Sequence, residues 1–361
     1  MLFRSRLLLF TGKGGVGKTT LAGATAAGLA ARGHKTLVVS TDPAHSLGDA
    51  FARRLTAEPV EVDRCLHGAQ VDSRGLVDEI WQDLRGKLRS AMAGAGLDAL
   101  EAEELTVLPG VDELLALTEV QRLAETGRWD TVVVDCGPTA ETLRLLALPE
   151  AISGYLDRMF GWQARLAARG TVEAIRRLAA HLESLRELLT DPETTGVRLV
   201  LTPERVVVAE ARRTLSALAL RGIQVDGVIV NRLLPAPRAR RGVGAGSPQD
   251  PAWWLRTRRK QQDAVLAGLA GSGLADYALV EHRAVEPVGL EALLEIATEL
   301  YGDADPLAGS GNGVGPLLEV SELEGGYRLR VALPESLREC RITGAESDAG
   351  GLVVSLTGRG A

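Results

Sequence analysis

Residues 12–19 read Gly-Lys-Gly-Gly-Val-Gly-Lys-Thr, between an apolar run at 7–10 and an Ala- and Leu-rich stretch that ends near Gly33. The run fits the frame G-x-x-x-x-G-K-[ST], and its flanks predict a strand before it and a helix after it. In this arrangement the glycine backbone directs its N–H groups at anionic oxygens beside a helix N-terminus. We therefore predict a phosphate-binding loop made of Gly12, Lys13, Gly14, Gly15, Val16, Gly17, Lys18, Thr19 and Thr20.

Two lysines stand in this loop, although only five of the 41 basic residues are lysines. Lys18 is the lysine that reaches the β- and γ-phosphates, and the Thr19 hydroxyl is placed to ligate Mg²⁺. The expected cofactors are therefore ATP or ADP and Mg²⁺. The additional Lys13 marks a subgroup of these loops and predicts an active site that is completed at a contact between two subunits.

Composition excludes several classes of protein. The chain has 361 residues, 45% of them hydrophobic and 24% charged, with a net charge of −6, which gives no support for nucleic-acid binding. Cys65, Cys136 and Cys340 are far apart and form no CxxC pair, so neither a zinc site nor a disulfide framework is predicted. Without a signal-peptide or transmembrane pattern, we expect a cytoplasmic protein that is not an integral membrane protein.

Short β-rich runs alternate with helical patterns, which predicts an α/β fold with a mostly parallel sheet flanked by helices. The expected strands are 6–11, 36–40, 131–135, 197–201, 225–230 and 277–280. Helices are expected at 206–220 and 288–301, and helical insertions at 74–127 and 151–195. Residues 236–250, rich in Gly, Pro and Arg, read as a mobile loop.

The pattern changes near residue 303. Residues 1–302 are predicted to form the ATPase domain, 303–316 a flexible Gly-rich linker, and 317–361 a small all-β domain. Strands are expected in it at 317–323, 327–333 and 352–356, with 341–343 as a further candidate.

Polar residues end three of the expected strands. Asp42 follows 36–40, where it either orients the attacking water or caps the helix after Pro43. Asp135 ends a buried run and is predicted to hold Mg²⁺, directly or through water. Asn231 can donate and accept at once, which fits an adenine edge, unless it caps or turns the chain.

These motifs resemble the arsenite-pump ATPases and the guided-entry ATPases that target tail-anchored membrane proteins, two groups of the deviant-Walker-A branch of dimeric phosphate-loop ATPases. The resemblance is carried, in the family's order, by residues 12–20, 40–49, 135–149, 202–204, 228–231 and 286–290.

The resemblance implies roles for single residues. Lys13 reaches across a homodimer to the partner's phosphates, Asp42 is the hydrolytic residue of the first switch, and Asp135 is the acid of the second. Asn231 reads adenine and Pro287 flanks the base. These roles complete the candidate site.

The chain also departs from the family. Ala140-Glu141 replace a Gly-His pair in the second switch, and Pro251 and Trp254 stand where the eukaryotic targeting factors carry a zinc-binding CxxC. A zinc-linked dimer is therefore not expected. Residues 317–361 resemble the small-heat-shock-like (α-crystallin-type) domain of some bacterial and plastid members.

Four functions remain open. The first is a dimeric ATPase that binds or targets hydrophobic, including tail-anchored, proteins. The others are a metalloid-pump ATPase, which the cysteines disfavour, a positioning ATPase, and a nucleotide-gated scaffold with little turnover. The scarcity of methionine, three residues in all, gives no sign of an adaptable client groove.

Overall fold

The computed structural model describes residues 5–42, 46–71, 111–135, 180, 182–219, 221–236, 251–270 and 277–308, and the backbone of four strands between 318 and 357. Most of the two predicted insertions, the loop 237–250 and the second-switch residues from Cys136 onward lie outside the described residues. None of the helices within these ranges is long and apolar enough to cross a membrane.

Eight strands form one sheet in the order β3-β4-β2-β5-β1-β6-β7-β8, and all neighbours are parallel except β3 and β4. Their bounds are β1 Arg6–Thr11, β2 Thr36–Ser40, β3 Val60–Asp63, β4 Leu66–Gln70, β5 Thr131–Asp135, β6 Thr195–Leu201, β7 Val225–Leu233 and β8 Tyr277–Glu281. The prediction of an α/β fold with a mostly parallel sheet is confirmed.

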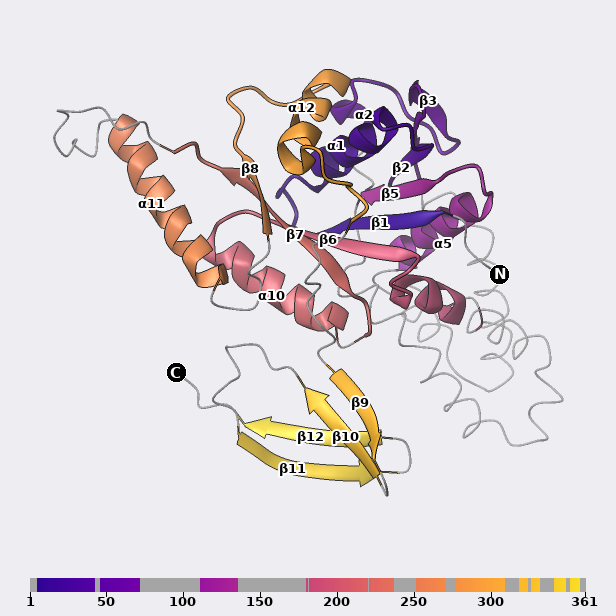
Figure 1. Ribbon diagram of the computed structural model, residues 1–361, viewed down its shortest axis with the longest axis vertical. Helices are drawn as coiled ribbons and strands as arrows, with labels where there is room; N and C mark the ends of the chain where they lie inside the picture. The colour runs from indigo at the N-terminus through magenta and orange to yellow at the C-terminus, as the bar shows by residue number, and fades with distance from the viewer. Residues whose placement is uncertain are drawn as a thin grey trace, which may run out of the picture.

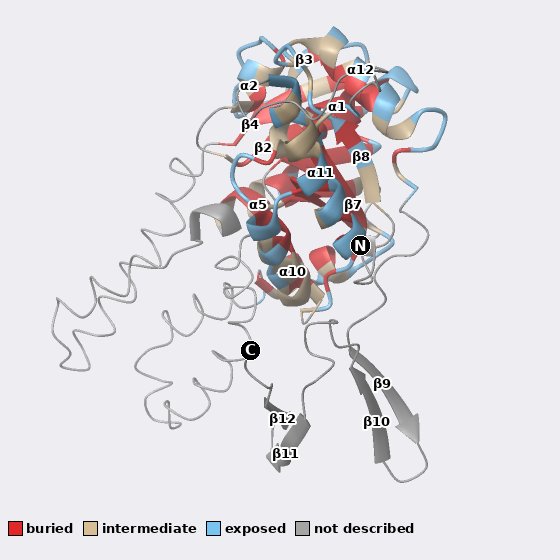
Figure 2. Cartoon of the chain, turned by 90° about the vertical axis from the view of Figure 1, so that its left-hand side faces the viewer, coloured by how far each residue is buried: buried red, intermediate tan, exposed pale blue. Residues whose placement is uncertain are grey.

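Helices cover both faces of the sheet, with α1 and α12 on one face and α5 and α10 on the other (Figure 1). The helices are α1 Lys18–Ala31, α2 Ser46–Ala50, α5 Val111–Glu125, α10 Arg205–Ala219, α11 Pro251–Ala270 and α12 Leu290–Tyr301. Residues 182–190 are also helical. Buried residues gather in the sheet and in α1, whereas the first half of α11 has no buried residue (Figure 2).

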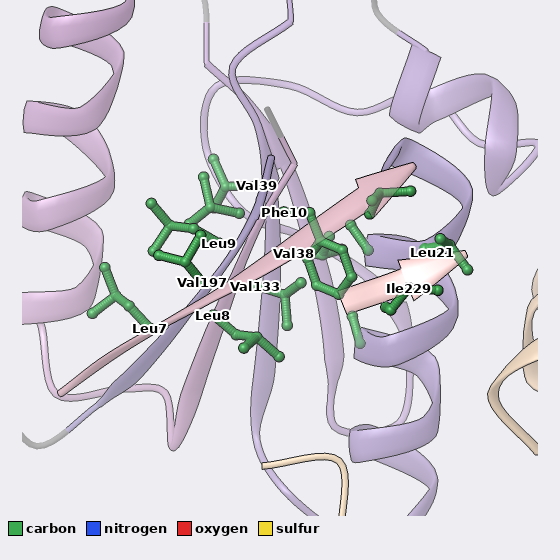
Figure 3. Packing of buried hydrophobic residues seen from close by; sticks show 14 of the residues in the cluster. Leu7, Leu8, Leu9, Phe10, Leu21, Val38, Val39, Val133, Val197 and Ile229 are labelled. Carbon is green, nitrogen blue, oxygen red and sulfur yellow. The ribbon is translucent and has the colours of Figure 1, made fainter. Parts of the chain in front are cut away.

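The core is built around β1, whose residues from Leu7 to Thr11 are all buried. A continuous apolar run of this kind is typical of a parallel strand that is covered on both faces. Leu8 and Phe10 point toward Leu21 of α1, and Leu7 and Leu9 point to the opposite face (Figure 3). The strand that carries the phosphate-binding loop is therefore fixed from both sides.

Small residues bring α12 close to α1. A Cβ on Gly28 would lie 2.9 Å from the Ala297 Cβ, so this crossing has no room for a larger residue. At the end of α12, the Tyr301 hydroxyl lies 2.7 Å from the Thr25 Oγ1 in the middle of α1. The helix that follows the predicted phosphate-binding loop is thus fixed against α12, the last helix of the α/β region.

The first residues of the predicted linker lie against this region. Arg32 donates to the Gly302 carbonyl at 2.6 Å, and Arg198 of β6 donates to the carbonyls of Pro306 at 3.1 Å and Ala308 at 3.4 Å. Pro306 is buried. Residues 302–308 are therefore held by the sheet and α1, and the rest of the predicted linker lies outside the described residues.

Some elements differ from the sequence-based expectation. Strands β3 and β4 and helix α11 were not predicted, and β6 begins at Thr195, inside the segment expected to be an insertion. The described part of the other insertion, α5, packs on β5 and buries Leu117, Val120 and Leu123 in the core. This helix therefore belongs to the α/β layers.

Four strands follow residue 317: β9 Leu318–Leu323, β10 Gly326–Val331, β11 Arg341–Asp348 and β12 Gly351–Thr357. β9 pairs with β10, and β11 with β12, each pair antiparallel. Strands therefore occur where the sequence predicted them. A folded domain over 317–361, and its small-heat-shock-like character, remain predictions.

Candidate nucleotide site

The phosphate-binding loop adopts a backbone that requires glycine. Gly12, Gly15 and Gly17 have φ values of 146°, 80° and 96°, a range that side chains rarely tolerate. A Cβ on Gly12 would lie 2.2 Å from the Val200 carbonyl oxygen. The glycines predicted to form the loop are thus held between β6 and the start of α1.

The N-terminus of α1 is left open for an anion. Gly17 is its N-cap and makes no side-chain capping hydrogen bond, and the first turn contains no acidic residue. Free backbone N–H groups and the helix dipole favour negative charge at such an end. The Lys18 Nζ lies beside it and donates to the carbonyls of Gly12 at 3.0 Å and Lys13 at 3.3 Å.

A cluster of oxygen atoms lies next to the loop. The Thr19 Oγ1 is 3.1 Å from the Ser46 Oγ of α2, and the Ser40 Oγ donates to the Asp135 Oδ2 at 3.2 Å. Burial raises the pKa of Asp135, and the Thr19 hydroxyl, Lys18 and the Ser40 hydroxyl oppose that shift. Among the residues that the structure describes, the buried Asp135 Oδ1 has no hydrogen-bond partner.

This donor set fits Mg²⁺. The ion takes carboxylate, hydroxyl and water oxygens, and a bound cation would satisfy the unpaired Asp135 oxygen and lower the pKa of that carboxyl. Thr19 and Asp135 are the residues that would hold it. When bound, the ion would supply positive charge opposite the phosphates.

Strand register explains why distant residues meet here. Gln70, Ser40, Asp135 and Phe10 form one row across β4, β2, β5 and β1, at the carboxyl ends of the first three strands. Ligand sites of open parallel sheets lie beyond these ends.

Asp42 stands just beyond this row. The Gln70 Nε2 donates to the Asp42 carbonyl at 2.7 Å, and the Asp42 backbone N–H donates to the Ser40 Oγ at 3.2 Å. The negative charge of the Asp42 carboxylate is close enough to raise the pKa of Asp135. The segment is therefore fixed by two side chains, Gln70 and Ser40, which sequence reasoning did not assign to the site.

Asn231 lies against the phosphate-binding loop. It is buried, its Nδ2 donates to the Val16 carbonyl at 2.9 Å, and its Oδ1 accepts from the Arg232 N–H at 2.9 Å. A Cβ on Gly17 would lie 2.3 Å from the Asn231 Nδ2. Asn231 thus braces the loop. The Asn231 amide has two N–H donors and two acceptor lone pairs, so these two hydrogen bonds leave positions for another partner. Its contact with adenine remains a prediction.

Pro287 lies in the loop between β8 and α12. The neighbouring Gly289 is the N-cap of α12, and its N–H donates to the Ala50 carbonyl of α2 at 2.8 Å. This loop therefore contacts the helix that follows Asp42, and the predicted contact between Pro287 and the base remains a prediction.

The comparison with protein families shows to which family of proteins the chain belongs. The model of the anion-transporting ATPase (ArsA) family matches residues 5–302, most of the chain and the whole of this site. The chain belongs to the anion-transporting ATPase family. It is an ATPase.

Three relatives of this ATPase cover large parts of both chains. Protein Rv2184c of Mycobacterium tuberculosis is 40% identical over 92% of this chain and 84% of its own. A putative arsenical pump-driving ATPase of Prosthecochloris vibrioformis is 34% identical over 83% and 76%. ATPase GET3C of Arabidopsis thaliana is 30% identical over 72% of each.

Within the described ranges, no group of three or more His, Cys, Asp or Glu side chains could hold a metal ion. Cys65 is the described cysteine, and it is a free thiol. Cys136 and Cys340 carry no described side chain.

Proposed function

We propose that this ATPase works as a homodimer that closes on Mg²⁺-ATP and opens after hydrolysis, and that this cycle drives the binding or targeting of hydrophobic, including tail-anchored, membrane proteins. The observation that carries the proposal is the complete phosphate-binding loop with the exposed Lys13, which resembles the loop of the guided-entry ATPases.

Each residue has a part in this cycle. Loop N–H groups and Lys18 bind the phosphates, Thr19 and Asp135 hold Mg²⁺, and Asp42 orients the attacking water. The Asp42 backbone is tied to β2 and β4, which supports this role because a base must be held within reach of its water. Lys13 of one subunit adds positive charge to the partner's phosphates.

The dimer is tested by sedimentation with ATP, ADP and a non-hydrolysable ATP analogue. The proposal expects a shift to dimer with ATP or the analogue, and a smaller shift with ADP. Asp42→Asn should keep ATP-induced dimers and lose hydrolysis. A protein that stays monomeric with every nucleotide would contradict the proposal.

Client binding needs a defined probe. A labelled peptide with one apolar segment of about 20 residues has the length of a transmembrane helix. We expect the Asp42→Asn protein to bind it more tightly with ATP than with ADP, and not to bind a matched peptide that carries three lysines in the segment. Equal binding of both peptides would argue against targeting.

The response to arsenite distinguishes the proposed function from the second candidate, a metalloid-pump ATPase, which the names of several relatives favour. A metalloid-pump subunit should hydrolyse ATP faster when arsenite or antimonite is added. We expect no stimulation of this chain. A severalfold increase in turnover would favour the pump.

A further inference from the structure

The second lysine of the loop has an ionic partner in its own chain. The Lys13 Nζ lies 2.9 Å from the Glu210 Oε2, and the two side chains are 41% and 38% exposed. Glu210 lies in the second turn of α10 and is the one acidic residue of that helix. The pair therefore joins the phosphate-binding loop to the helix that follows β6.

The two loop lysines point to different partners. Lys18 donates to the carbonyls of Gly12 and Lys13 and so stays within the loop. Lys13 leaves the loop and meets a carboxylate on α10. An exposed cation that must act on another subunit's phosphates is thus neutralised inside its own subunit.

We propose that Glu210 is a positioning residue that holds Lys13 on α10 until a partner's ATP competes for it. This inference rests on the proposed function, in which Lys13 acts across the dimer. A triphosphate offers Lys13 more negative charge than one carboxylate does, and more than a diphosphate does. Exchange of Lys13 from Glu210 to the partner is therefore favoured when ATP is bound.

The exposure of the pair sets the size of the effect. Ion pairs at such positions are screened by water and salt, and they shift an equilibrium by about two- to fivefold. Glu210 therefore raises the protein concentration at which dimers form and does not prevent their formation. The effect should weaken as the salt concentration rises.

The test uses Glu210→Gln, which keeps the shape of the side chain and removes its charge. ATPase activity is measured against protein concentration in the full chain at low salt. The variant should reach half-maximal activity at about two- to fivefold lower protein concentration, with kcat at saturation unchanged. In a Lys13→Gln background, the same substitution should not change the dimerisation constant measured with the ATP analogue.

A matched control is Glu183→Gln. Glu183 pairs with Arg186 at 3.8 Å, with exposures of 40% for Arg186 and 44% for Glu183, so the change in net charge and exposure is similar. We expect no shift for this variant. Equal shifts for both variants would overturn the proposal, because the cause would then be net charge.

A second readout follows Lys13 directly. In the nucleotide-free protein, an amine-reactive reagent should acylate Lys13 faster in Glu210→Gln than in the wild type, with the exposed Lys35 as internal reference. An unchanged acylation rate would contradict the proposal that Glu210 holds Lys13 on α10. Wild-type protein that stays monomeric with ATP would overturn the proposed function and this inference together, whereas a dimer that is insensitive to Glu210 overturns the inference alone.

Discussion

Two carboxylates of the same sheet, the buried Asp135 and the partly buried Asp226, have different surroundings. Asp135 ends β5 and Asp226 is the second residue of β7, and burial is the main cause that raises the pKa of each. Asp226 accepts a hydrogen bond at 2.8 Å from the Nε of Arg198, a full opposite charge. Asp135 accepts its hydrogen bond, at 3.2 Å, from the neutral hydroxyl of Ser40.

We interpret Asp226 as a structural acid, and we propose that Asp135 is a functional one. The fold neutralises Asp226 with Arg198, which also binds the carbonyls of Pro306 and Ala308. In the proposed function, Asp135 instead holds Mg²⁺ beside the open N-terminus of α1. The predictions below test this contrast.

The largest effect is expected from Asp135→Asn. Removing the charge that is proposed to hold Mg²⁺ should lower kcat at least about 100-fold, since a catalytic metal is worth several kcal/mol. Steady-state ATPase assays check this at saturating Mg²⁺-ATP. The matched control, Asp226→Asn, should keep near-normal kcat per folded molecule, and a similar loss in both variants would remove the contrast.

Asp226→Asn should instead act on stability. Breaking this partly buried ion pair leaves the buried Arg198 without its countercharge, and we expect a loss of about 3 kcal/mol in the free energy of unfolding. Urea unfolding measures it. Replacing both partners, with Arg198→Met and Asp226→Leu, should recover most of the loss. If the double variant were as unstable as the single one, the pair would not be the reason.

The pH dependence of stability should reveal the raised pKa of Asp135. Below the unfolded value of about 3.9, both states hold the proton and the group has no effect. As pH rises from there through the raised folded pKa, the unfolded state releases the proton first, so the wild type loses stability relative to Asp135→Asn.

Urea midpoints of the two nucleotide-free proteins with a chelator, compared over this range, test the sign. Mg²⁺-ATP should reverse the difference, because it binds the ionised carboxylate. A difference that does not change with pH would contradict the assignment.

The smallest effect concerns the contact between α1 and α12. Tyr301→Phe removes the hydrogen bond to Thr25 and should lower the free energy of unfolding by about 1 kcal/mol. Thermal unfolding measures it, and the ATPase rate should not change. A loss of activity without a loss of stability would place Tyr301 in the nucleotide cycle.

The sequence predicted much of the sheet, because its central strands are continuous apolar runs. It failed for β3, with the sequence VEVD, and for β4, with LHGAQ, which are short and polar. Helix α11 was missed because it lacks a clear apolar face. Tertiary packing, not local pattern, defines these elements.

The candidate site likewise contains residues that the local sequence predicted and residues that only the tertiary structure reveals. The phosphate-binding loop, Asp42 and Asp135 follow from a motif and from strand ends. Gln70 could not be predicted, because its place in the row beside Ser40 depends on a strand that the sequence did not reveal. Glu210 meets Lys13 through the packing of α10, and a contact between residues so far apart leaves no local signal.

The central claim is that Lys13 acts on the partner's nucleotide while Asp42 acts on its own. Mixing Lys13→Ala and Asp42→Asn chains tests it directly, since each variant alone should be inactive. A mixed dimer then contains one intact site, and random pairing in a symmetric dimer predicts about a quarter of wild-type activity in the mixture. No recovery on mixing, with mixed dimers shown to form, would contradict the account.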